Sequence, residues 1–167
     1  MRRWITLILC LALLTGCTPA AAASGATFST NESATVENTA AAVKTQRLTV
    51  VLNGCIAYEV DSAGGSLKTA IAAADLVVFL AGDFVPDDLP GETDAWHQAL
   101  DDDDRATMDA NWPGVYRCAQ DICADPAAQQ GLLDDAGVTT DFSAMDLTDV
   151  PAQLDEMNTA LLSLQRK

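Results

Sequence analysis

The stretch LTVVLNGCIAYEV, residues 48–60, decides between the two folds that this sequence allows. Read with a period of two, it contains two β-prone runs around Asn53-Gly54, which is the strongest short-range signal for a hairpin. Read with the helical period, the polar residues Thr45, Thr49 and Asn53 recur every four positions, and the apolar residues gather on the other side. Because no later segment reads as a partner strand, and because a lone hairpin is marginal in water, we favour the helix.

Downstream of this stretch, the sequence carries start and stop signals for helices. We expect one helix between Ser66, as its N-cap, and Gly82, and a short helix capped by Asp94. Four carboxylates at 101–104 would cover every face of a single helix. A break is therefore predicted there, followed by a helix from about Asp103 to Asn111.

The last third of the chain predicts three more helices. Pro113 is expected to open the first of them, and Asp125-Pro126, a cap followed by a first-turn proline, the second. The third begins near Pro151 and carries an apolar stripe that we assign to the core: Val150, Leu154, Met157, Leu161 and Leu164. The fold class is thus mostly α, a small helical bundle-like domain after a disordered tether. The alternative is an α+β domain with an N-terminal hairpin at 48–60.

The first 17 residues, MRRWITLILCLALLTGC, have the layout of an export signal. Arg2 and Arg3 precede an apolar run from Trp4 to Leu14. As a helix this run would be about 16 Å long, which is too short for a bilayer core of about 30 Å. The run ends in Leu14-Thr15-Gly16-Cys17. This order of positive charge, apolar run and Leu–small–small–Cys box resembles the signal of bacterial lipoproteins.

In that family the signal is cut before the cysteine, whose thiol carries diacylglycerol and whose new amino group is often acylated. The resemblance implies a signal peptide at 1–16, a lipidated Cys17, and anchoring to the outer face of a bacterial membrane in the cell envelope. Residues 17–42, rich in Ala, Ser and Thr, are expected to form a flexible tether. The acidic, mostly helical domain is expected to occupy residues 43–167.

The composition limits the partners of that domain. A chain of 167 residues fits one domain plus appended segments. Its 24 acidic side chains outnumber 9 basic ones, which gives a net charge of -15. Such a charge repels nucleic acid and anionic lipid headgroups, so we exclude nucleic-acid binding and expect membrane contact through the lipid anchor only.

Three cysteines remain besides Cys10, in the signal, and Cys17. Disulfides persist in exported proteins, and Cys55 and Cys118 both lie on predicted apolar faces, so we predict that these two are paired. Cys123 would then be left over. Without a C-x-x-C motif or a second histidine, neither a redox site nor a structural zinc site is expected.

Two groups of residues are candidates for a binding site. Carboxylates are the ligands that Ca²⁺ prefers, and a loop facing the acidic run could hold such an ion. Its candidate ligands are Asp83, Asp87, Asp88, Asp101, Asp102, Asp103 and Asp104. The second group is a candidate interaction surface of ring-bearing side chains close to loop breaks, namely Trp96, His97, Trp112 and Tyr116.

No catalytic motif accompanies these residues. His97 is the single histidine and is expected to be partly exposed on a short helix, and no G-x-S-x-G, S-x-x-K or phosphate-loop pattern occurs. We therefore expect a module that binds an envelope protein or a small ligand, with no cofactor beyond the covalent lipid. Two alternatives stay open: a domain that binds a divalent cation, and an envelope enzyme or accessory without a recognisable motif.

Overall fold

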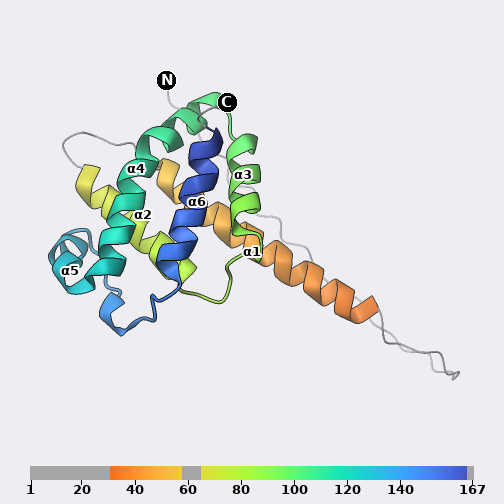
Figure 1. Ribbon diagram of the computed structural model, residues 1–167, viewed down its shortest axis with the longest axis horizontal. Helices are drawn as coiled ribbons and strands as arrows, with labels where there is room; N and C mark the ends of the chain where they lie inside the picture. The colour runs from red at the N-terminus through yellow and green to blue at the C-terminus, as the bar shows by residue number, and fades with distance from the viewer. Residues whose placement is uncertain (1–30, 58–64, 165–167) are drawn as a thin grey trace, which may run out of the picture.

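The structure is a computed structural model that describes residues 31–57 and 65–164. Six α-helices run through these residues, with a 3-10 turn, η1, before the last. Their bounds are α1 Asn31–Ala57, α2 Gly65–Leu80, α3 Leu89–Ala99, α4 Asp102–Ala124, α5 Pro126–Asp135, η1 Phe142–Ala144 and α6 Val150–Leu164. No strand occurs in the described ranges, which confirms the mostly-α prediction (Figure 1).

The hairpin alternative for 48–60 is wrong as far as the structure describes that stretch. Residues 48–57 belong to α1, and 58–60 lie outside the described residues. The helix is favoured because it places Leu48, Leu52 and Cys55 on one face, where all three are buried. Packing of this apolar face fixes a helix despite the Asn53-Gly54 pair.

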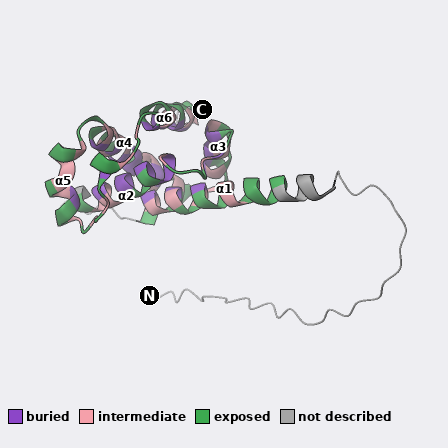
Figure 2. Cartoon of the chain, turned by 90° about the horizontal axis from the view of Figure 1, so that it is seen from below, coloured by how far each residue is buried: buried purple, intermediate pink, exposed green. Residues whose placement is uncertain are grey.

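The same helix begins at Asn31, inside the segment for which the sequence predicts a tether. Residues 37–42 of it are exposed, and this half of α1 projects beyond the bundle (Figures 1 and 2). The signal sequence and Cys17 lie outside the described residues. Among the helices that the structure describes, none is long and apolar enough to cross a membrane.

The central helix, α4, corrects the prediction of two separate helices around Pro113. It is continuous from Asp102 to Ala124, with Pro113 inside it and exposed. An internal proline removes a backbone hydrogen bond and costs about 3 kcal/mol. Burial of the flanking Trp112 and Val115 offsets this cost, as does the hydrogen bond that Asn111 Nδ2 donates to the Cys55 carbonyl oxygen (2.9 Å). Proline on the solvent side is therefore tolerated.

Aspartates begin three of the helices, although one is not the residue expected. Asp88, not Asp94, caps α3 by accepting from the Gly91 amide (3.0 Å). The predicted break before α4 is confirmed, with Asp101 accepting from the Asp104 amide (2.9 Å). Asp125 caps α5 as predicted. A side-chain oxygen that accepts from an N-terminal amide satisfies a donor that the helix itself leaves unpaired.

The core lies around α4, which packs against α1, α2, α5 and α6, while α3 packs on α6. The apolar stripe of α6 is confirmed as core: Val150, Leu154, Met157 and Leu161 are buried, and Leu164 is half-buried. On the other side of the bundle, α1 and α2 lie next to each other (Figure 1). This pair encloses the cavity described below.

Candidate functional site

The structure does not assemble the candidate Ca²⁺ ligands into one site. Asp87 pairs with Lys44, and Asp102 pairs with Arg105 (2.9 Å). Asp88 and Asp101 are occupied as helix caps. Asp83, Asp103 and Asp104 are exposed. Within the described residues no three His, Cys, Asp or Glu side chains are grouped so that they could hold a metal ion. The acidic run therefore starts helices and faces solvent.

The four ring-bearing residues do not form the shared surface that the sequence indicates. Trp112 is a core residue, only 1% exposed, with Nε1 donating to Asn158 Oδ1 (3.0 Å). The half-buried Tyr116 stacks on it at 6.1 Å between ring centroids and donates its hydroxyl to Asp155 (2.6 Å). This hydrogen bond to the carboxylate, together with burial and the Asp155 charge, raises the pKa of Tyr116. The pair ties α4 to α6.

His97 and Trp96 also serve packing. The expectation that His97 is partly exposed is wrong, because it is 2% exposed, with Nε2 at 3.0 Å from Asp109 Oδ1. Trp96 is half-buried and donates from Nε1 to Asn53 Oδ1 on α1 (3.1 Å). A second cavity of about 430 Å³ adjoins His97, Arg105 and Leu164. Three backbone carbonyls at the end of α3 accept from the Arg105 guanidinium, which holds that end of α3 to α4.

The three cysteines of the described residues are free thiols, so the predicted Cys55–Cys118 disulfide is not formed in this structure. Cys55 is buried, and Cys118 and Cys123 are half-buried. Burial, and second the charge of Asp75, raises the pKa of Cys55 to about 12. Burial also raises the pKa values of Cys118 and Cys123. Thiols held in the protonated state are poor nucleophiles, which argues against a catalytic cysteine.

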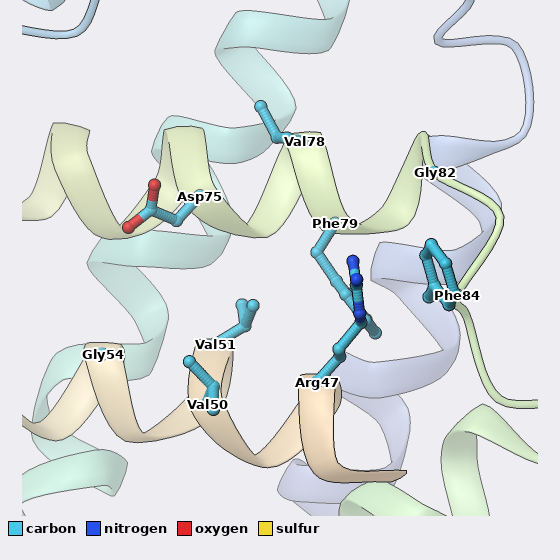
Figure 3. Close-up of a pocket in the computed structure, with 9 residues that line it drawn as sticks. All are labelled: Arg47, Val50, Val51, Gly54, Asp75, Val78, Phe79, Gly82 and Phe84. Atoms are coloured by element: carbon cyan, nitrogen blue, oxygen red, sulfur yellow. The ribbon is translucent and has the colours of Figure 1, made fainter. Parts of the chain in front are cut away.

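An apolar groove between α1 and α2 is the site that sequence reasoning missed. Its cavity measures about 360 Å³, which falls within the range of about 300–1,000 Å³ typical of small-molecule sites. Residues of both helices and of the loop after α2 line it (Figure 3): Arg47, Val50, Val51, Gly54, Asp75, Val78, Phe79, Gly82 and Phe84. We call this site the α1/α2 groove.

Apolar side chains stand open to solvent around the α1/α2 groove. Val50 is 65% exposed, Phe84 41% and Val78 40%. Val51 and Phe79 form its deeper wall, since they are more buried. Single exposed apolar residues are ordinary, but several around one cavity indicate a binding surface. Helical spacing alone does not reveal this site, because Val78 continues the apolar spacing of Ile71 and Ala74 and is nevertheless 40% exposed.

The two charged residues of the α1/α2 groove lie at opposite ends (Figure 3). At one end, the Arg47 guanidinium stacks on the Phe84 ring, with Cζ 3.7 Å from the ring centroid. Asp75 on α2 and Gly54 on α1 lie at the other end, where partial burial raises the pKa of the Asp75 carboxyl group. Between these ends the lining is apolar, so the groove suits an elongated ligand with a polar group at one end.

No family model matches this chain, and no curated protein or solved structure compared with it does either.

Proposed function

We propose that this chain is an exported bacterial lipoprotein whose acidic helical domain is a binding module and uses the α1/α2 groove as its binding site. The observation that carries the proposal is the group of exposed Val50, Val78 and Phe84 around a cavity of about 360 Å³. Burying these side chains under a ligand would remove apolar surface from water, which favours association.

The anchor part of the proposal rests on the resemblance of residues 1–17 to a lipoprotein signal. Two or three acyl chains hold a protein stably at a membrane where a single chain is marginal. With a net charge of -15, the domain is repelled by anionic headgroups. The lipid would therefore keep the module near the membrane while its groove stays available to a ligand.

Photo-crosslinking in the native membrane tests the binding role. A photoreactive benzoylphenylalanine replaces Val50 in the full chain, and a second variant carries it at Ser143, an exposed residue of η1 outside the groove. After irradiation of whole membranes, intact-mass spectrometry detects any adduct. We expect a discrete added mass at position 50 that is absent at position 143. Equal labelling at the two positions, or none at either, would refute the groove as the binding site.

A further inference from the structure

The chemistry of the α1/α2 groove points to a particular ligand class. We propose that it binds one fatty acid, with the carboxylate on Arg47 and the hydrocarbon tail along the apolar walls of α1 and α2. This inference rests on the proposed function, since it names the ligand of the same groove.

Arg47 is arranged to receive an anion. One face of its guanidinium is covered by the Phe84 ring, and the side chain makes no hydrogen bond or ion pair with the rest of the described chain. Stacking uses the face of the guanidinium and leaves its in-plane N–H donors available. Those donors form a fork that matches a carboxylate bidentately. The neighbouring cation, Lys44, is already paired with Asp87, so Arg47 is the anchor for an incoming carboxylate.

The walls beyond Arg47 suit a hydrocarbon tail. Val50 and Val51 from α1 and Val78 and Phe79 from α2 line the cavity, and Figure 3 shows the Val51 side chain pointing toward α2. None of these side chains offers a hydrogen bond, so a flexible chain would find continuous apolar contact. Asp75 at the far end repels a second anionic group, which excludes dicarboxylates.

The size of the cavity favours a ligand with a single hydrocarbon chain. A volume of about 360 Å³ lies at the lower end of the range for small-molecule pockets, which matches one hydrocarbon chain better than the two chains of a phospholipid. The acyl chains of a lipidated Cys17 would be another source of hydrocarbon. They are attached through ester, thioether or amide bonds and carry no anionic group for Arg47, so a free fatty acid fits better.

Photo-labelling with a diazirine derivative of dodecanoate tests the proposal. The full lipidated chain is placed in lipid nanodiscs, labelled over a range of probe concentrations, and digested for peptide mapping. We expect saturable labelling of the peptides that carry Arg47–Gly54 and Asp75–Phe79. Arg47→Gln should weaken labelling about tenfold, because a charge-assisted hydrogen bond is lost. Arg117→Gln, at an exposed arginine of α4 outside the groove, should leave it unchanged.

A competition experiment distinguishes recognition of the carboxylate from non-specific hydrophobic binding of the tail. Dodecanoate should displace the probe, and dodecanol, which has the same tail without the carboxylate, should compete at least tenfold more weakly. Equal competition by the two would overturn the role of Arg47. Circular dichroism spectra confirm folding of each variant, and Val78→Asp provides a second, independent block of the groove.

The outcomes distinguish this inference from the proposed function. If the fatty-acid probe does not label the groove but Val50 crosslinking still yields a discrete adduct of another kind, the fatty acid is wrong and the binding module stands. An adduct with the Cys17 lipid itself would likewise overturn the free fatty acid. If neither experiment labels the groove, both proposals fall.

Discussion

The two sides of the helical bundle differ in how far their side chains are buried and hydrogen-bonded. Where α4 meets α6, Trp112 is enclosed and its indole N–H donates to Asn158, and the half-buried Tyr116 donates its hydroxyl to Asp155. Where α1 meets α2, Val50, Val78 and Phe84 stay open to water, and Arg47 offers hydrogen-bond donors that no described residue accepts. The closed side is a packing interface, whereas the open side has the features of a ligand site.

The closed side also contains two buried polar atoms that lack a hydrogen-bond partner among the described residues. They are Thr93 Oγ1 on α3 and Gln153 Oε1 on α6. Neither lines the α1/α2 groove, and both belong to the α3 and α6 side of the bundle. The comparison therefore predicts that substitutions on the closed side change stability, and that substitutions on the open side change binding.

The largest expected effect is at Trp112, the biggest enclosed side chain. Trp112→Ala should lower the free energy of unfolding by about 3–5 kcal/mol, because it leaves a cavity and removes the donor to Asn158. Urea unfolding followed by circular dichroism measures the change. Val78→Ala on the open side is the matched control, and a comparable loss there would contradict the division between the two sides.

Next in size is the pair formed by the buried His97 and the half-buried Asp109. Asp109→Ala removes the carboxylate at 3.0 Å from a ring that is 2% exposed, so the ring loses this hydrogen-bond partner. We expect a loss of about 1–3 kcal/mol in the same unfolding measurement. A change below about 0.5 kcal/mol would show that this pair does not hold α3 against α4.

A smaller effect is expected at Asp75, at the far end of the groove. Its folded pKa is raised, so stability is lost as the pH rises above the ordinary carboxyl value of about 3.9 and through the folded pKa. Asp75→Asn should therefore stabilise the protein at pH 7, by less than about 1 kcal/mol because solvent screens the site. Below about pH 4 the difference should vanish. Asp83→Asn, in an exposed loop, serves as the control for charge alone.

The smallest effect on stability is expected at the groove rim itself. Val78→Asp should change the free energy of unfolding by no more than about 0.5 kcal/mol, since Val78 is 40% exposed. The same variant should lose the adduct that Val50 crosslinking detects. Retention of the adduct in a folded Val78→Asp protein would argue that the ligand sits elsewhere.

Thiol reactivity compares a buried position with two partly open ones. Cys55 has a pKa of about 12 and is buried, so it should resist iodoacetamide at pH 8 until the protein unfolds. Cys118 and Cys123, which are half-buried, should react faster. Mapping of the alkylated peptides with and without prior reduction measures the rates. Labelling of Cys55 only after reduction would instead support the disulfide predicted from the sequence.

The sequence predicts the helices better than it predicts the site. The apolar stripe of α6 and the cap at Asp125 are local patterns, and the structure follows both. The prediction that Pro113 opens a new helix was wrong because burial of Trp112 and Val115 outweighs the cost of the backbone hydrogen bond that proline removes. The α1/α2 groove depends on how two helices meet, and on a loop that brings Phe84 to Arg47. No local spacing rule encodes that meeting.

Native mass spectrometry of the full-length protein, extracted from its own membranes, tests the central claim most directly. We predict a mass that begins at an acylated Cys17, plus a fraction carrying one small additional ligand. The ligand-bound fraction should disappear in Val78→Asp, while the acylated mass remains. A chain that starts elsewhere would contradict the anchor. An acylated chain with no ligand, or with ligand unaffected by Val78→Asp, would contradict the α1/α2 groove as the binding site.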